Sequence, residues 1–247
     1  MSVIEGKFVW FELFTRDPKK AQGFYGEVVG WKVTPMPMGD TTYEMMSAGD
    51  KPIGGYAAAD RNAAPHWTSY LAVADLDAAM GRVKAEGGKV LGAVETVPAV
   101  GRMVRVADPT GGSFHLFQPA SASEPDAPPA PGTFHWNELH TPDPARAVGF
   151  YTRALGYRVK EMDMGPVGTY HVLEQGGAPR AGVMKAQGDT PTMWLPYVAV
   201  DDADAASARA TRAGGKVVTP PEDIPDIGRF AILADREGAV FAIIRPA

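Results

Sequence analysis

The sequence predicts an α+β fold built from two tandem domains, each containing two copies of a module made of a strand, a helix and three further strands. Three observations lead to this prediction. A long internal repeat spans the chain, a fainter repeat recurs inside each half, and each module carries helix-start and helix-stop signals between alternating apolar runs.

The long repeat relates the two halves of the chain almost residue for residue. Matches first recur at an offset of 126 positions, and after one inserted residue the offset is 127 up to the C-terminus. The first block pairs Trp10, Glu12, Leu13, Thr15, Asp17, Phe24, Tyr25 and Gly30 with Trp136, Glu138, Leu139, Thr141, Asp143, Phe150, Tyr151 and Gly156. The whole chain is therefore a duplication.

A short Pro/Ala-rich segment separates the two copies. Residues 121–132 read SASEPDAPPAPG, a composition that favours an extended, semi-rigid connector without its own core. We therefore place an N-terminal domain at residues 1–120, a linker at residues 121–132 and a C-terminal domain at residues 133–247.

The first module shows the expected order of elements most clearly. Apolar alternation over Phe8 to Thr15 predicts a strand. Asp17-Pro18 then provides an N-cap and a proline for the first helical turn, and Gly30 ends the helix. Shorter strands should follow at Lys32 to Met36, Thr42 to Ser47 and Ile53 to Ala59, between turn-forming residues. The other three modules contain corresponding stretches.

Composition restricts the classes of partner. The formal charge is −5 and no run of Lys or Arg occurs, so we expect neither nucleic acid nor a membrane as a partner. The chain has no cysteine, which excludes disulfides and thiolate catalysis. The first ten residues lack the apolar core of a signal peptide, and we expect a cytoplasmic protein.

Two pairs of motifs resemble a known superfamily. The segments AQGFYGEVVGW and AVGFYTRALGY follow the predicted first strands, and DPTGGSFHLF and DREGAVFAII close the two halves. This set resembles the vicinal oxygen chelate superfamily, which contains glyoxalases, bleomycin resistance proteins and dioxygenases. FVWFELFTRD and FHWNELHTPD look like its tandem branch of hypothetical hydroxylases and glyoxalase-like antigens of actinomycetes. The resemblance implies that each pair of βαβββ modules forms a curled, cup-shaped mixed sheet with helices outside.

The resemblance also identifies where metal ligands would lie. Those positions are occupied here by Trp10, Thr68, His115, Trp136, Leu195 and Ala242. Only His115 could bind a metal, which argues against a standard glyoxalase I or extradiol dioxygenase site. We therefore favour no cofactor. The alternative is one divalent ion (Zn, Ni, Fe or Mn) held by His115, Glu138 and His140, if the second and third modules share a cup.

Strand alternation predicts which side chains would line the cups. It places Phe8, Trp10, Glu12 and Phe14 on one face of the first strand, and Phe134, Trp136, Glu138 and His140 on the matching face. Trp67 and Trp194 fall on the helix-covered face. The expected ligand-binding residues are Trp10, Tyr43, Thr68, Tyr70, Trp136, Tyr170 and Tyr197, a set suited to flat aromatic or heterocyclic compounds.

Glu12 and Glu138 are the catalytic candidates, because a carboxylate inside an apolar strand is costly unless it is satisfied. Each could act as a general base or anchor a ligand hydroxyl. The structural alternative is an ion pair with Arg102 or Arg229. Met36, Met38, Met45 and Met46 could likewise form an adaptable binding lip or ordinary core and loop.

Two functions follow from these expectations. The preferred one is a small-molecule-binding protein without the standard metal ligands, which binds an apolar or aromatic compound in detoxification, resistance or secondary metabolism. The alternative is a glyoxalase-like lyase or isomerase, or a hydroxylase, that uses a glutamate as base with or without a divalent metal. We expect a monomer or a weak homodimer, because four modules in one chain can supply two cups.

Overall fold

The structure is a computed structural model that describes residues 3–38, 41–60 and 63–247. Met1 and Ser2 of the predicted N-terminal domain lie outside the described residues. The chain divides into two compact units: unit 1 contains Met1–Val9, Ser69–Ala127 and Trp136–Trp194, and unit 2 contains Trp10–Thr68, Pro128–His135 and Leu195–Ala247. Each unit thus combines one module from each half of the sequence, while the predicted domain boundaries stay a prediction.

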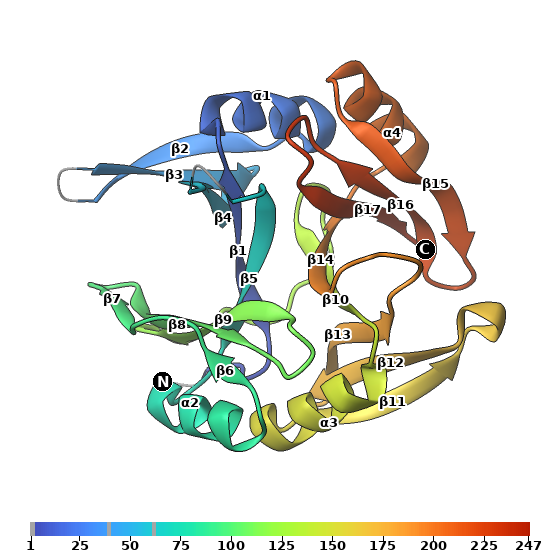
Figure 1. Cartoon of the computed structure of the whole chain (residues 1–247). Helices are drawn as coiled ribbons and strands as arrows, with labels where there is room; N and C mark the ends of the chain where they lie inside the picture. Colours follow the sequence, from blue (N-terminus) through green and yellow to red (C-terminus); the bar gives the residue numbers. More distant parts are fainter. Residues whose placement is uncertain (1–2, 39–40, 61–62) are drawn as a thin grey trace. The chain divides into compact units, whose positions relative to one another are not determined.

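The described residues form four modules in chain order (Figure 1). The first contains β1 (Phe8–Thr15), α1 (Pro18–Val29), β2 (Lys32–Met38), β3 (Thr41–Ala48) and β4 (Lys51–Ala58). The second contains β5 (His66–Ala72), α2 (Leu76–Ala85), β6 (Lys89–Val90), β7 (Glu95–Val97), β8 (Gly101–Ala107) and β9 (Ser113–Pro119). The third contains β10 (Phe134–Thr141), α3 (Pro144–Leu155), β11 (Arg158–Asp163), the short 3-10 helix η1 (Gly165–Val167), β12 (Thr169–Gln175) and β13 (Ala178–Lys185). The fourth contains β14 (Met193–Ala199), α4 (Ala203–Arg212), β15 (Lys216–Ile224), β16 (Gly228–Ala234) and β17 (Val240–Pro246).

The elements predicted for the first module are confirmed. The Asp17 side chain accepts a hydrogen bond from the Lys20 amide and caps α1, and Gly30 ends the helix in the left-handed conformation at φ 76°. The predicted first strand coincides with β1, and the three later strands extend or shift by one or two residues at their ends. The capping residues Asp17 and Gly30 therefore fix the two ends of α1.

Each module contributes a quartet of paired strands to a mixed sheet, which confirms the α+β class. The quartets run β2-β3-β4-β1, β5-β9-β8-β6, β11-β12-β13-β10 and β14-β17-β16-β15. Among the described residues, β1–β9 belong to one sheet and β10–β17 to a second. The inner pairs, such as β1 with β4 and β10 with β13, are parallel, whereas the hairpins are antiparallel.

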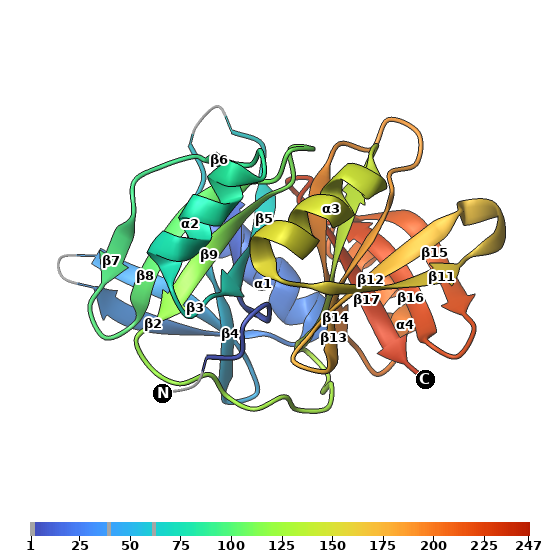
Figure 2. The same ribbon diagram turned by 90° about the horizontal axis from the view of Figure 1, so that it is seen from below.

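The core of each unit is closed by helices from opposite halves of the sequence. In unit 1, α2 packs beside α3, as both views show (Figures 1 and 2). In unit 2, α1 packs beside α4 in the same way. No helix among the described residues is long and apolar enough to cross a membrane.

A buried tyrosine and aspartate join the two modules within each unit. Tyr151 on α3 donates its hydroxyl hydrogen to Asp108 at 2.8 Å, and Tyr25 on α1 donates to Asp235 at 3.2 Å. Burial raises the pKa of both tyrosines well above the usual range, so they remain hydroxyl donors. The tyrosine of each FY motif thus binds the aspartate that opens a closing motif of the other sequence half.

The aromatic cores confirm part of the predicted strand faces. Trp67 and Trp194 are buried in packing positions, as expected. Phe8 and Phe134, however, do not lie on the open face: Phe8 packs 5.0 Å from Trp194 in unit 1, and Phe134 packs 5.6 Å from Trp67 in unit 2. The first residues of β1 belong to unit 1 and the rest of β1 belongs to unit 2, whereas the reverse holds for β10. Phe8 and Phe134 therefore pack in the aromatic core of the unit to which each belongs.

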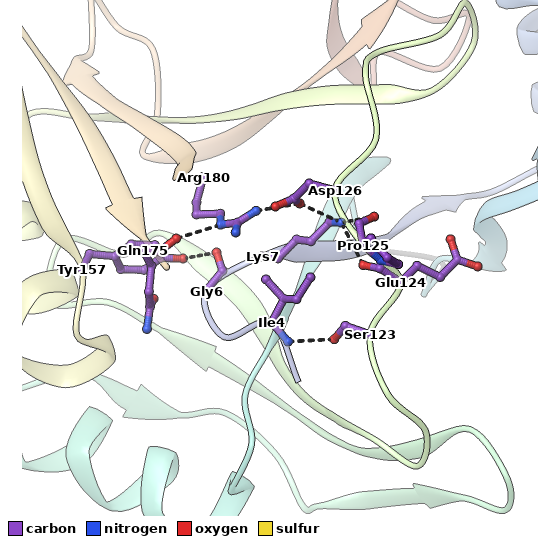
Figure 3. A network of polar contacts seen from close by, with 10 residues as sticks. All are labelled: Ile4, Gly6, Lys7, Ser123, Glu124, Pro125, Asp126, Tyr157, Gln175 and Arg180. Atoms are coloured by element: carbon purple, nitrogen blue, oxygen red, sulfur yellow. Dashed lines mark hydrogen bonds and ion pairs between the residues drawn. The ribbon is translucent and has the colours of Figure 1, made fainter. Parts of the chain in front are cut away.

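The first part of the predicted linker is bound firmly to unit 1. Asp126 accepts ion-paired hydrogen bonds from Arg180 at 2.7 Å and from Lys7 at 3.0 Å, and the Ser123 hydroxyl accepts from the Ile4 amide (Figure 3). Nearby, Tyr157 donates to the Gly6 carbonyl oxygen at 2.6 Å. This part of the connector, without helix or strand, is therefore held by side-chain contacts.

Candidate functional site

The sheet faces opposite the helices carry most of the predicted site residues. Leu13 and Leu139 are completely buried in the cores, and alternation directs Glu12 and Glu138 to the other face. The two glutamates are only 8% and 5% exposed, respectively. Their carboxylates therefore need polar partners, and each finds a tyrosine hydroxyl on the next strand but one of its sheet.

In unit 2, three side chains form a hydrogen-bonded cluster across the sheet. Trp10 Nε1 donates to the Tyr43 hydroxyl oxygen at 3.0 Å, and that hydroxyl donates to Glu12 Oε1 at 2.8 Å. Trp10 and Glu12 come from β1, whereas Tyr43 comes from β3. We call Trp10, Tyr43 and Glu12 the N-terminal cluster; its tryptophan and tyrosine are partly exposed.

Unit 1 repeats this cluster and extends it by one residue. Trp136 Nε1 donates to the Tyr170 hydroxyl oxygen at 2.8 Å, and Tyr170 donates to Glu138 Oε2 at 2.7 Å. His140 Nε2 lies 2.8 Å from the other carboxylate oxygen, Glu138 Oε1. These four residues form the C-terminal cluster, all from β10 and β12.

A glycine on the strand between the tyrosine and the glutamate makes each cluster possible. Gly55 is the register partner of Glu12, and Gly182 is the register partner of Glu138. A Cβ atom at either glycine would lie within the van der Waals radius of the tyrosine hydroxyl. The tyrosine therefore crosses directly over a bare backbone to reach the carboxylate.

Sequence reasoning did not identify these glycines as site residues. They recur at the same offset of 127 as Tyr43 and Tyr170. Glycine inside a strand commonly marks the close approach of another group, so that signal was available. Met36, one of the methionines of the expected binding lip, pairs with Tyr43 across the antiparallel strands. Met162, which sequence reasoning did not single out, pairs with Tyr170.

The electrostatic state of the clusters follows from burial. Burial, and then the negative charge of the adjacent glutamate, raises the pKa of Tyr43 and of Tyr170 well above the usual range. Both tyrosines therefore keep their protons and donate to the carboxylates. Each cluster is thus a series of hydrogen-bonded polar groups bordered by aromatic rings and a methionine side chain.

The two clusters differ at two matched positions. His140 occupies the place that Phe14 occupies in the other copy, and Phe14 stacks on His66 at 5.2 Å between ring centroids. On the adjacent parallel strand, Met184 is the register partner of His140, and Ala57 is that of Phe14. The C-terminal cluster therefore adds an ionisable group and a flexible thioether.

The remaining predicted ligand-binding residues are buried in their own units. In unit 1, Tyr70 on β5 stacks on its register partner His115 on β9 at 4.4 Å with nearly parallel rings. In unit 2, Tyr197 is the register partner of Ala242, and Thr68 is buried. His115 and Ala242, which the resemblance aligns with metal-ligand positions, thus lie beside Tyr70 and Tyr197, respectively.

The arginine alternative for the buried glutamates is wrong. Arg102 instead pairs with Asp77 at 2.8 Å, and Arg229 pairs with Asp204 at 2.6 Å. Both aspartates lie in the first turn of the helix that precedes the arginine, an exposed position at which a flexible guanidinium remains hydrated. The carboxylates instead accept hydrogen bonds from the hydroxyls of Tyr43 and Tyr170.

The donor set was tested for the metal ion that the superfamily commonly uses. Within the described part of the chain, no three His, Cys, Asp or Glu side chains are grouped so that they could hold a metal ion. Glu138 and His140 are adjacent on β10, whereas His115 lies on β9 of the other sheet. The residues brought together in the described part of the chain do not fit such a centre.

The duplicated βαβββ fold is that of glyoxalase-type proteins. A family model described as a glyoxalase-like domain matches residues 137–244, and one described as bleomycin resistance protein-like N-terminal matches residues 7–49. The chain belongs to the glyoxalase/bleomycin resistance protein/dioxygenase superfamily, also called vicinal oxygen chelate.

Full-length relatives support this assignment. The chain is 36% identical to "Putative glyoxylase CFP32" of Mycobacterium tuberculosis, covering 96% of this chain and 94% of that protein. It is 31% identical to "Anthracycline biosynthesis protein DnrV" of Streptomyces peucetius, over 97% and 93% of the two chains. A Mn(II)-bound glyoxalase from Novosphingobium aromaticivorans shares the fold, with a TM-score of 0.67 at 20% identity, covering 99% of this chain and 82% of that one.

Proposed function

We propose that this protein binds a planar, largely apolar small molecule against the N-terminal and C-terminal clusters. The observation that carries the proposal is the duplicated chain from tryptophan through tyrosine to glutamate, built over a glycine in both copies. A purely structural hydrogen bond would not require an indole and a phenol left partly exposed at the same place.

The chemistry of the two faces suits an aromatic ligand. The rings of Trp10 and Trp136 offer stacking surface, and the cross-strand methionines Met36 and Met162 offer adaptable, polarisable contacts. Glu12 and Glu138 can accept a hydrogen bond from a ligand hydroxyl at the end of each chain. Two relatives named for anthracycline biosynthesis support a small organic compound as the ligand.

Titration of the protein with planar aromatic compounds tests the proposal. Naphthoquinone is a suitable first probe, because the chain has no cysteine to which a quinone could add. We expect quenching of tryptophan fluorescence that is lost in a Trp10→Leu, Trp136→Leu double variant. Quenching of the same size in that variant, or no binding of any planar probe, would contradict the proposal.

A second candidate function is an enzyme of the glyoxalase type, a lyase or isomerase, or a hydroxylase. The contact between His140 and Glu138 favours it, because an imidazole supported by a carboxylate is a common general base. The relative named as a glyoxylase points the same way. Turnover by the wild type that falls at least about a hundredfold in Glu138→Gln would support this function over simple binding.

A further inference from the structure

Besides the change from Ala57 to Met184 on the adjacent strand, the two clusters differ at the matched position of Phe14 and His140. This second difference gives Glu138 an imidazole partner where the other copy has an apolar ring. Phe14 contributes an apolar ring, which stacks on His66, whereas His140 contributes a polar imidazole that is hydrogen-bonded to Glu138. Both residues occupy the same position of the repeat, on β1 and β10 respectively. The fold therefore accommodates either side chain at this point.

Hydrogen bonding indicates which ring nitrogen of His140 carries the hydrogen. Tyr170 donates to Oε2 of Glu138, so the carboxylate acts as an acceptor. The contact of 2.8 Å between His140 Nε2 and Glu138 Oε1 then requires the hydrogen on Nε2. In a neutral imidazole this leaves the unprotonated Nδ1 as a hydrogen-bond acceptor.

We propose that the C-terminal cluster selects ligands carrying an acidic hydroxyl, such as a phenol or an enol, and that the N-terminal cluster does not. This inference rests on the proposed function and specifies which ligands the C-terminal cluster prefers. The ligand hydroxyl transfers its proton to Nδ1 of His140, and the resulting oxyanion accepts a hydrogen bond from that Nδ1–H. A hydroxyl as acidic as that of lawsone is already ionised near neutral pH, so its anion binds with uptake of one proton from water. Glu138 on the opposite side of the ring stabilises the positive imidazolium. Phe14 offers the N-terminal ligand only stacking.

A pair of probes separates selectivity from binding itself. Naphthoquinone presents the plane alone, and lawsone presents the same ring system with one acidic hydroxyl. Isothermal titration of the wild type should give one site that prefers lawsone by about tenfold or more, the usual size of a charge-assisted hydrogen bond. The other site should bind both probes alike.

The repeat supplies matched variants for this experiment. His140→Phe introduces the residue that the first copy already carries, and it should lower the affinity for lawsone at least about tenfold more than the affinity for naphthoquinone. Phe14→His should create the preference at the N-terminal cluster. Circular dichroism and urea unfolding verify that each variant folds.

The outcomes are distinct. Equal affinity for the two probes in the wild type, or a lawsone preference that survives His140→Phe, would overturn the inference and leave the proposed function standing. Failure of both probes to bind would contradict the proposed function and the inference together. A preference lost in His140→Phe and gained in Phe14→His would establish the selectivity of the C-terminal cluster.

Discussion

The hydroxyl of Tyr170 lies 2.7 Å from Glu138 Oε2, and it reaches that carboxylate by crossing over the bare backbone of Gly182. The same arrangement recurs at Tyr43, Glu12 and Gly55 in the other copy. Duplication has thus preserved a three-residue geometry on two separate sheets.

The first prediction concerns this glycine. Gly182→Ala should displace the Tyr170 hydroxyl, because the new methyl group and the hydroxyl oxygen cannot occupy the same space. We expect a loss of about 1–3 kcal/mol in the free energy of unfolding, the usual cost of overpacking. Urea unfolding measures it.

Gly81→Ala is the matched control for that variant. Gly81 lies inside α2 with nothing within 4 Å of its added Cβ atom, so alanine should stabilise the protein by about 0.5–1 kcal/mol. Similar unfolding curves for Gly182→Ala and the wild type would show that the tyrosine can move aside without loss.

The second prediction concerns the buried tyrosine and aspartate of each unit. Tyr151→Phe removes the donor to Asp108 and should cost about 1–3 kcal/mol of unfolding free energy, because a buried acceptor loses its partner. Tyr25→Phe should act similarly through Asp235. Thermal unfolding of both variants tests this, and an unchanged melting temperature in either would contradict it.

Much of the fold could be predicted because its signals are local. Asp17-Pro18 and Gly30 mark the ends of α1 by capping chemistry alone, and the alternation of β1 is visible in eight residues. The contact between Tyr25 and Asp235 could not be predicted in this way. It joins residues 210 positions apart, and no local pattern records which modules share a core.

The candidate site divides along the same line. Alternation placed Trp10 and Glu12 on one face, and the repeat identified Tyr43, but the order of their hydrogen bonds depends on strand pairing. The expectation that Arg102 might neutralise a buried glutamate failed because a nearer carboxylate, Asp77, was available. Which of several carboxylates an arginine pairs with depends on the folded structure and cannot be read from the sequence.

The third prediction concerns acid stability. Hydrogen bonding to Arg180, and then to Lys7, lowers the pKa of Asp126 to about 2. Because this pKa lies below its unfolded value, the stabilisation is complete above about pH 4 and is lost as the pH falls towards 2. Asp126→Asn should therefore destabilise the protein at neutral pH but much less at pH values near 2.

The size of that effect is limited by exposure. The Asp126 side chain is 50% exposed, so solvent screening reduces the expected loss to about 1 kcal/mol or less. Urea unfolding of the wild type and the variant at both pH values measures it. An equal difference at the two pH values would exclude a role for the ionised carboxylate.

The fourth prediction concerns metal removal. In the proposed function the clusters contact the ligand through side chains alone, so dialysis against a chelator should leave the affinity for naphthoquinone unchanged. Elemental mass spectrometry before and after dialysis provides the control. Near one equivalent of zinc, nickel, iron or manganese, lost together with binding and absent from His115→Ala, would contradict this account.

Fluorine NMR of protein labelled with fluorotryptophan tests the central claim most directly. The chain has five tryptophans, of which Trp31, Trp67 and Trp194 are buried in the cores and only Trp10 and Trp136 are partly exposed in the clusters. Single Trp→Phe variants assign the five signals. We predict that naphthoquinone shifts the signals of Trp10 and Trp136 and leaves the other three in place; shifts confined to the core tryptophans, or none at all, would contradict the account.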